Sequence, residues 1–303
     1  MPDAKLPQRP LGKTGVQVPI IGYGTAPLGK IEEDVLPKDK AVKLLNYAID
    51  RGITYLDTSP DYGSQPRLGE VMKTRRDEVF LATKVNKRKH DEVLEEIRRN
   101  LKELQTDHVD LVQIHAVSTM ADLEAALAPD GAISALEEAR RSGMTRFVGI
   151  TGHARPSVLA QALERYSFDT VLVALGAIDR LVNNPESVFL PVAERKGAGV
   201  IAMKVYGHGE MKERELSLRY SLSLPSVSLA ILGMKDEKEI EENIKLAQAY
   251  KPLEQDELDT LIEEARQVIQ KNNKAEENSP IFWLYDLTTM AWKQSSEPEM
   301  VAY

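Results

Sequence analysis

The sequence predicts an α/β protein built as a (β/α)8 TIM barrel, with a β-hairpin before the barrel and an extra helix and tail after it. Three observations lead to this prediction. Eight short apolar segments alternate with amphipathic helical patterns along the chain. Their ends lie 24 to 36 residues apart, which leaves room for one loop, one helix and one strand. The segments are apolar at successive positions, as parallel strands covered by helices are.

The eight expected strands are, in chain order, residues 19–25, 53–58, 79–84, 109–115, 146–151, 170–175, 199–204 and 227–233. One marker near each strand end gives the spacing: Gly24, Asp57, Lys84, His115, Thr151, Leu175, Lys204 and Gly233. A doubly wound sheet is the alternative fold. However, no GxGxxG sequence opens a helix after the first strand, and GYGTAPLG (22–29) lacks that spacing.

Helical patterns fill the gaps between these strands. Residues 38–52 have helical periodicity and end at Gly52, a suitable residue for a helix C-terminus. Residues 91–104 repeat apolar side chains at helical spacing, and residues 133–143 end at a second glycine, Gly143. Residues 156–166 begin with Pro156, which suits the first turn of a helix.

Two parts of the chain lie outside the repeat. Residues 9–18 are expected to form a hairpin that turns at 13–15 and covers the bottom of the barrel. Residues 254–271 form an added amphipathic helix, and the tail after it carries Trp283 and Trp292, which either line a substrate pocket or pack on barrel helices. No linker interrupts the pattern, so residues 1–303 are expected to form a single domain.

Composition excludes several classes of function. The net charge of −8 argues against a nucleic-acid partner, and no apolar run approaches the ~18 residues of a membrane span. The absence of cysteine excludes disulfides and thiolate catalysis, and the five histidines lack a close metal-ligand spacing. The start of the chain has no signal-peptide core, so a cytoplasmic location is expected.

Polar residues stand at the ends of three neighbouring strands. Asp57 ends the second strand, Lys84 the third and His115 the fourth, while Tyr62 lies on the loop after the second. Because chemistry in a (β/α)8 barrel collects at the C-terminal ends of its strands, these four side chains are expected to converge at one rim.

With these residues in place, the sequence resembles the aldo-keto reductase family over roughly residues 9–250. The resemblance is carried by LGKTG, GYGTAPLG, DTSPDYG, the ATK that ends in Lys84, DLVQIH and LGMKDEKEIEEN. It implies reversible hydride transfer between a nicotinamide cofactor and an aldehyde or ketone. It also implies that Tyr62 is the general acid, that Lys84 and Asp57 tune it, and that His115 orients the substrate carbonyl.

Elementary chemistry supports these roles. A free tyrosine has a pKa of ~10, and a nearby ammonium group lowers that value. Lys84 can supply the ammonium group, and Asp57 can keep it charged and aimed. His115 can donate a hydrogen bond to the carbonyl oxygen, where negative charge develops.

The resemblance also implies a cofactor site. Its expected contacts are Gly24, Thr25, Ala26 and Asp57 near the first two strands, and Gly233, Lys235, Glu239, Glu242 and Asn243 around the last strand and helix. A helix start with a nearby cation favours a phosphate, so Lys235 supports NADP(H). Glu239 stands where many relatives carry an arginine, which leaves NAD(H) open.

Three positions depart from the family pattern. GITGH provides Thr151, Gly152 and His153 in place of the Ser-Asn pair that binds the carboxamide. Leu172 replaces a glutamine, and Met203 replaces the aromatic residue that stacks on the nicotinamide. We expect Thr151 or His153 to bind the carboxamide and Tyr206 to replace the stacking residue, while Lys204 meets either the pyrophosphate or the substrate. GITGH and AMK together suggest a branch of the family, here without its cysteine-rich C-terminal cluster.

The predicted function is therefore an NADP(H)-dependent carbonyl reductase acting on a small molecule, with the oligomeric state left open. The alternative is a nicotinamide-binding sensor or scaffold subunit with slow or no turnover. The four rim residues favour the enzyme, and the three departures keep the alternative open.

Overall fold

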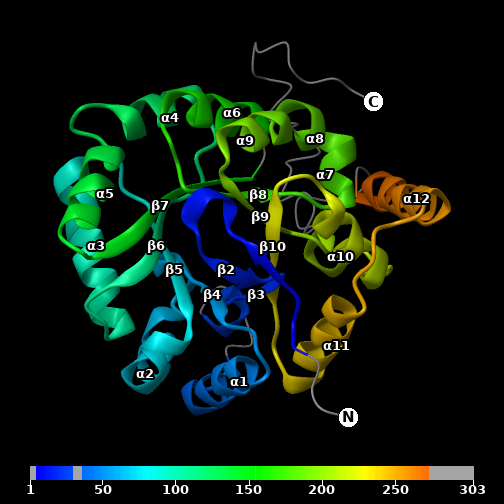
Figure 1. Cartoon of the computed structure of the whole chain (residues 1–303), viewed down its shortest axis with the longest axis horizontal. Coiled ribbons are helices and arrows are strands. Elements are labelled where there is room, and N and C mark those ends of the chain that lie inside the picture. Colours follow the sequence, from blue (N-terminus) through cyan, green and yellow to red (C-terminus); the bar gives the residue numbers. More distant parts are fainter. Residues whose placement is uncertain (1–4, 30–35, 154, 273–303) are drawn as a thin grey trace.

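The computed structural model describes residues 5–29, 36–153 and 155–272, in which eight parallel strands close into a barrel surrounded by helices (Figure 1). Around the barrel the strands follow the order β10-β3-β4-β5-β6-β7-β8-β9. They are β3 (Ile21–Gly24), β4 (Tyr55–Asp57), β5 (Phe80–Val85), β6 (Val109–Ile114), β7 (Thr145–Gly152), β8 (Thr170–Ala174), β9 (Gly199–Met203) and β10 (Val227–Gly233). Each strand overlaps the segment expected from sequence, with ends that differ by at most two residues, so the predicted barrel is confirmed.

Helices follow the strands and cover the outside of the barrel. They are α1 (Lys38–Asp50), α2 (Gln65–Arg75), α3 (His90–Leu104), α4 (Met120–Leu127), α5 (Ala132–Arg141), α6 (Pro156–Arg165), α7 (Ala177–Val182), α8 (Pro185–Val188), α9 (Leu190–Lys196), α10 (Arg214–Ser223), α11 (Glu237–Gln248) and α12 (Gln255–Asn272). The helical patterns expected at 38–52, 91–104, 133–143 and 156–166 correspond to α1, α3, α5 and α6. None of the described helices has the length and apolar character required to cross a bilayer.

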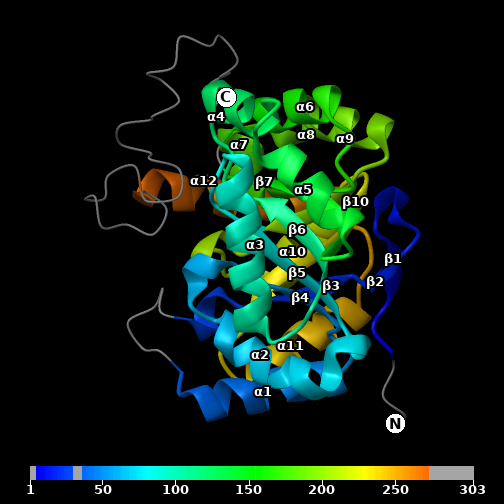
Figure 2. The same cartoon turned by 90° about the vertical axis from the view of Figure 1, so that its left-hand side faces the viewer.

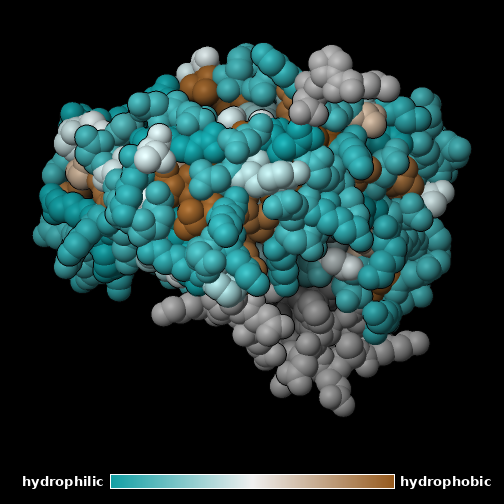
Figure 3. Space-filling view, turned by 90° about the horizontal axis from the view of Figure 1, so that it is seen from below, coloured by the Kyte–Doolittle hydropathy of each residue, from teal (hydrophilic) through white to brown (hydrophobic). Residues whose placement is uncertain are grey.

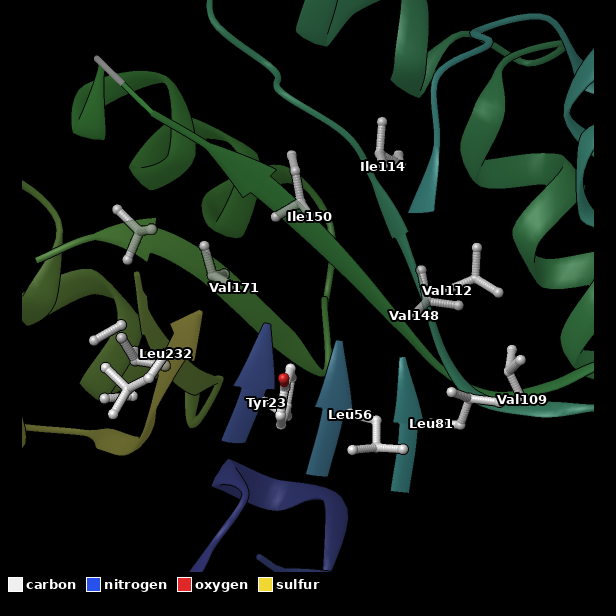
Figure 4. Packing of buried hydrophobic residues seen from close by; sticks show 14 of the residues in the cluster. Tyr23, Leu56, Leu81, Val109, Val112, Ile114, Val148, Ile150, Val171 and Leu232 are labelled. Carbon is white, nitrogen blue, oxygen red and sulfur yellow. The ribbon is translucent and has the colours of Figure 1, made fainter. Parts of the chain in front are cut away.

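Alternation along each strand separates two apolar regions. Outward-facing side chains such as Tyr23, Leu56 and Leu81, on neighbouring strands, belong to the large cluster packed between barrel and helices (Figure 4). Inward-facing Tyr55, Leu172 and others form a second cluster inside the barrel. Successive side chains of a strand point to opposite faces, so the position of each polar residue along its strand decides whether it reaches the barrel axis.

The N-terminal hairpin closes the bottom of the barrel, as predicted. Strands β1 (Gln8–Pro10) and β2 (Gln17–Pro19) pair antiparallel, and their ribbon crosses the front of the barrel in Figure 1. Leu11 and Val18 belong to the interior cluster. The hairpin backbone lies so close to the start of β9 that a Cβ on Gly12 would stand 2.2 Å from the backbone nitrogen of Gly199.

The added helix predicted at 254–271 is α12, which lies on the opposite side of the barrel from the hairpin (Figure 2). Its apolar side chains Leu261, Ala265 and Val268 pack in one cluster with residues of α7 and α10. The face in Figure 3 is mainly hydrophilic, with apolar residues in small groups. Trp283 and Trp292 lie outside the described residues.

Candidate active site

A buried ion pair joins the ends of two neighbouring strands. The Lys84 Nζ on β5 donates to Asp57 Oδ1 on β4 at 2.5 Å and to the carbonyl oxygen of Thr58 at 2.8 Å. The two side chains of the pair are only 1% and 3% exposed. Burial opposes the charge on Lys84, but the attraction of Asp57 and Tyr62 outweighs it, so the pKa of Lys84 is raised. Lys84 therefore carries a stable positive charge.

The second oxygen of Asp57 also has a donor. Gln113 on β6 donates from Nε2 to Asp57 Oδ2 at 3.1 Å, and Gln113 is fully buried. Asp57, Lys84 and Gln113 are all inward-facing and adjacent around the barrel, since Lys84 pairs with Gln113 in the β5–β6 ladder. Three strands therefore hold the carboxylate. Sequence reasoning missed Gln113, although it is a polar residue two positions before His115 in an otherwise apolar strand.

Tyr62 ends a short 3-10 turn, η3 (Pro60–Tyr62), directly after β4. The Lys84 Nζ lies 4.9 Å from the centroid of its ring. The turn is pressed against Gly29, where a Cβ would stand 1.6 Å from the carbonyl oxygen of Tyr62, so only glycine fits there. Tyr62 therefore lies beside the ammonium group of Lys84, the charge that the sequence analysis paired with it.

The pKa of Tyr62 is higher than the sequence analysis predicted. Burial raises it, and the lowering by the positive charge of Lys84 is the smaller effect. Lys84 does lower the pKa of Tyr62, as the sequence analysis expected, but the expected net lowering is wrong, because burial has the larger effect and the pKa stays above its ordinary value. The residue therefore retains its proton at neutral pH, as a general acid requires.

The ring of His115 stands next to Tyr62, with 6.3 Å between ring centroids and an angle of 82° between ring planes. Its Nδ1 lies 2.8 Å from Asn86 Oδ1 and 3.4 Å from Asp61 Oδ2. Burial lowers the pKa of His115 although hydrogen bonding with Asp61 raises it. The predicted four residues are thus brought together at one rim.

Hydrogen bonds with two residues, Glu96 and Arg88, fix the loop that carries Asn86. The Glu96 carboxylate on α3 accepts from the backbone N–H groups of Asn86 and Lys87 at 2.8 and 3.1 Å. Arg88 donates to the carbonyl oxygens of Asn86 and His115 at 3.0 and 2.7 Å. The position of Asn86 relative to His115 is therefore fixed by the fold.

The end of β7 brings Thr151, Gly152 and His153 to the same rim. The Thr151 hydroxyl accepts from the Ala116 N–H at 2.8 Å. The His153 ring lies 6.3 Å from the His115 ring, and its Nδ1 is buried without a hydrogen-bond partner among the described residues. Burial and the positive charge of Lys204 hold the pKa of His153 well below 6.5. Any Cβ on Gly152 would meet the Val117 carbonyl oxygen at 2.9 Å.

On the next two strands, Leu172 and Met203 face the barrel interior, where they belong to or pack on the interior cluster.

Lys204 follows β9 with a left-handed backbone, φ 59°. Burial lowers the pKa of Lys204 to about 8, against the attraction of Asp179. Lys204 is thus a second cation at this rim, with the opposite pKa shift from Lys84.

Tyr206 is joined to α11 and α10. Its hydroxyl donates to Asn243 Oδ1 at 2.7 Å, and the Arg214 guanidinium lies 4.6 Å from its ring centroid. Asn243 is fully buried and donates to the Glu239 carbonyl oxygen at 2.8 Å. Asn243 thus positions Tyr206, and Glu242 lies 3.9 Å from Arg214. Arg214, at the start of α10, is a cation that the sequence analysis did not single out.

The start of α11 is capped by its own acidic residues. Asp236 accepts from the Glu239 N–H at 2.8 Å, and Glu239 accepts from the exposed Lys235 N–H at 2.7 Å. Glu239 therefore turns its carboxylate toward the loop after β10, where Gly233 is exposed. This contact gives the residue a structural role that the sequence comparison did not suggest.

The end of β3 is bound to β4. The Thr25 backbone N–H and hydroxyl both donate to the Asp57 carbonyl oxygen at 2.9 Å, and Thr25 is buried. A Cβ on Gly24 would meet Ile231 at 2.7 Å, and Ala26 opens the following turn. Tyr23 and Leu28 are fully buried, so neither lines an open pocket, and the Tyr23 hydroxyl donates to the Met234 carbonyl oxygen.

Comparison with known proteins agrees with this arrangement. The pattern of the aldo/keto reductase family matches residues 20–216, more than half of the chain. The chain is 29% identical over 284 residues to L-galactose dehydrogenase of Arabidopsis thaliana, covering 79% of this chain and 88% of that protein. It is 29% identical over 235 residues to D-threo-aldose 1-dehydrogenase of a Pseudomonas species, covering 66% and 70%.

A solved aldo-keto reductase from Klebsiella pneumoniae, in complex with NADPH, has the same fold. The TM-score is 0.70 at 22% identity, covering 85% of this chain and 94% of that chain. The predictions of the family and of an oxidoreductase enzyme are confirmed. This chain belongs to the aldo/keto reductase family, whose members are oxidoreductases acting on carbonyl compounds.

Proposed function

We propose that this chain reversibly reduces a small aldehyde or ketone to an alcohol with NADP(H), and that Tyr62 is the general acid. The observation that carries the proposal is the buried Asp57–Lys84 pair beside Tyr62, with His115 at 6.3 Å from the Tyr62 ring. A buried ion pair next to an ionisable phenol is costly to maintain for stability alone, since burying both charges carries a large desolvation penalty. Its position at the C-terminal rim supports a catalytic role.

Each residue has a defined part in proton delivery. Tyr62 holds a proton at neutral pH and releases it to the substrate oxygen, while the Lys84 charge stabilises the phenolate that remains. Asp57 keeps Lys84 in place, and Gln113 keeps Asp57 in place through its second oxygen. The His115 ring, 6.3 Å from the Tyr62 ring, orients the substrate.

The residues at the end of β7 fit a nicotinamide carboxamide. The Thr151 hydroxyl accepts one hydrogen bond and keeps its own proton available for a carbonyl oxygen. The buried Nδ1 of His153 lacks a partner among the described residues, and a buried polar atom without a partner costs ~1–3 kcal/mol. A carboxamide offers both a donor and an acceptor for these two groups. When bound, the cofactor supplies or accepts the hydride.

Three cations support NADP(H). Lys235 is exposed next to the start of α11, Arg214 lies beside Tyr206 and Glu242, and Lys204 follows β9. The NADPH complex of the Klebsiella pneumoniae structure supports the same cofactor. The Glu239 carboxylate keeps NAD(H) as a second candidate, since it opposes a phosphate near the helix start. Gly24, Ala26 and Gly233 are proposed to contact the cofactor through their backbone.

Tyr206 is proposed to shape this site from the α11 side. Its contacts with Asn243 and Arg214 favour a role in holding the cofactor region together over stacking on the nicotinamide. We also propose one domain, since the described residues form one barrel with its covering helices, and a cytoplasmic location. The substrate is proposed to be a small molecule, because the site lies at the barrel rim.

The test compares wild type with Tyr62→Phe. We expect bound NADPH to be oxidised by a panel of aldehydes and ketones in single-turnover measurements, and the variant to lose ~10²- to 10⁴-fold in rate. Its cofactor affinity should change little, since only the phenolic proton is removed. Retention of more than about a tenth of the wild-type rate would reject Tyr62 as the acid. Cofactor binding without turnover in wild type would favour the sensor or scaffold alternative.

A further inference from the structure

Two acceptors face the same nitrogen of His115. The Nδ1 lies 2.8 Å from Asn86 Oδ1 and 3.4 Å from Asp61 Oδ2. The other ring nitrogen, Nε2, makes no hydrogen bond with the described part of the chain. The centroids of the Tyr62 and His153 rings each lie 6.3 Å from the centroid of the His115 ring. Nδ1 is thus bound to the protein, and Nε2 is left for a ligand.

Asp61 decides which end of the Asn86 carboxamide faces His115. Asn86 Nδ2 donates to Asp61 Oδ1 at 2.8 Å. An ionised carboxylate only accepts hydrogen bonds, so the NH2 end of Asn86 must face Asp61. Hydrogen bonding with His115 lowers the pKa of Asp61, which keeps it ionised at neutral pH. The carboxamide oxygen is therefore left to face Nδ1, which must carry a proton to satisfy it.

We propose that Asp61 and Asn86 hold the neutral His115 ring in its Nδ1–H form, so that Nε2 is an acceptor that selects substrates with a hydroxyl beside the carbonyl. The inference deepens the proposed function and rests on it for the substrate. Tyr62 then donates to the carbonyl oxygen, and the neighbouring hydroxyl donates to Nε2. A substrate that has only hydrogen-bond acceptors at that position would face the lone pair of His115 Nε2 without a proton to share. Such a substrate is disfavoured.

The same arrangement limits how His115 meets a carbonyl oxygen. Neutral imidazole has one donor and one acceptor, so with Nδ1 protonated only imidazolium can donate from Nε2. The charged and titratable groups around His115 are Asp57, Asp61, Tyr62, Lys84, Arg88 and His153. Burial outweighs Asp61 and lowers the pKa of His115, so the ring is neutral at pH 7. The sequence analysis expected His115 to donate a hydrogen bond to the substrate carbonyl oxygen. Nε2 can make that bond only when both ring nitrogens are protonated and the ring is positively charged.

The first test reads the tautomer directly and needs no turnover. Proton–nitrogen NMR of the 15N-labelled protein resolves five histidines, with His115 assigned by the loss of its signals in His115→Gln. We expect protonated Nδ1 and unprotonated Nε2 in wild type at pH 7.5. In Asp61→Asn the obligatory acceptor is gone, Asn86 is free to turn, and an Nε2–H form should appear. A wild-type ring protonated at Nε2 would overturn the inference, whatever the enzyme reduces.

The second test measures selectivity with hydroxyacetone and methoxyacetone, in which a methyl group replaces the hydroxyl hydrogen and leaves only an ether acceptor. Wild type should prefer hydroxyacetone in kcat/KM, and Asp61→Asn should reduce the preference by about three- to tenfold, the value of one hydrogen bond. The control Asp91→Asn alters the exposed carboxylate beside His90 and should keep the wild-type preference. An unchanged preference in Asp61→Asn would overturn the selective role. Loss of all turnover in wild type with the expected tautomer would instead reject the proposed function.

Discussion

Two buried aspartates lie near opposite ends of the barrel and are bound in different ways. Asp57 ends β4 at the top and faces inward, where its partners are Lys84 and Gln113. Asp110 lies near the start of β6 at the bottom. It accepts from Arg76 and the Leu81 N–H at 2.8 Å and from Arg146 at 2.7 Å.

The difference lies in the cations. Arginine keeps its charge at any physiological pH, and Arg146 is 54% exposed to water. The pair at the top consists of an almost fully buried lysine beside a phenol, so its charge is coupled to the proton of Tyr62. The bottom cluster joins β5, β6 and β7 through two arginines and a backbone N–H. An aspartate bound by arginines and backbone is suited to stability, while one bound to a buried lysine beside a tyrosine is suited to the proton transfer that we propose for this site.

The largest effect is expected for Lys84→Met. The variant leaves the buried Asp57 carboxylate with Gln113 as its remaining side-chain donor, which should lower the free energy of unfolding by ~3–5 kcal/mol. Carbonyl reduction should fall by ~10²-fold or more, since the phenolate of Tyr62 loses its counter-charge. Denaturant unfolding and single-turnover kinetics measure the two effects. A folded variant that keeps its rate would remove Lys84 from the mechanism.

Asp110→Asn tests the other end of the barrel. Loss of the charge-assisted contacts with Arg76 and Arg146 should lower the free energy of unfolding by ~1.5–3 kcal/mol. The steady-state constants of the folded variant should stay within about twofold of wild type, because the substitution is distant from the rim. A slower chemical step in this variant would show that the two ends are coupled and would weaken the contrast.

Lys204 extends the comparison to a second rim lysine. Its folded pKa of about 8 is below its ordinary 10.5, so the cofactor-free protein should become more stable as pH rises from about 8 to 10.5. The unfolded chain binds the extra proton in that window. Lys204→Met should remove this rise in thermal midpoint. If Lys204 meets a cofactor phosphate, NADPH affinity should also fall above pH 8 in wild type and not in the variant.

The smallest effect is expected at Glu239, which accepts a backbone N–H as Asp110 does. Glu239→Gln keeps an acceptor for the Lys235 N–H and removes the negative charge. NADPH affinity should rise by about two- to fivefold relative to NADH, the size of an exposed charge interaction. Fluorescence titration with both cofactors measures the ratio. Equal changes in the affinities for NADPH and NADH would mean that the 2′-phosphate of NADPH does not lie near Glu239.

The barrel and the four catalytic candidates were predictable because they depend on local pattern. An apolar strand that ends in Asp57, Lys84 or His115 is visible in one sequence, and alternation then directs the side chain inward. The contacts of Asn86 with Asp61 and His115 cross 25 and 29 residues between loops. Their geometry depends on the turn before Tyr62 and on the Glu96 anchor, which no spacing reveals. Tyr206 was assigned by position after a strand, but packing against α10 and α11 decides where it lies.

The N-terminal hairpin has a consequence for how the protein is made. The Arg9 guanidinium donates to the carbonyl oxygens of Leu222 and Val227, which follow it by 213 and 218 residues. At ~5–20 residues per second, a ribosome delivers those partners roughly ten to forty seconds after Arg9. Strand β3 must likewise wait for β10. The hairpin and β3 therefore cannot dock until β10 has been made, and a nascent chain halted before residue 227 exposes an open β-edge that chaperones must shield from other chains.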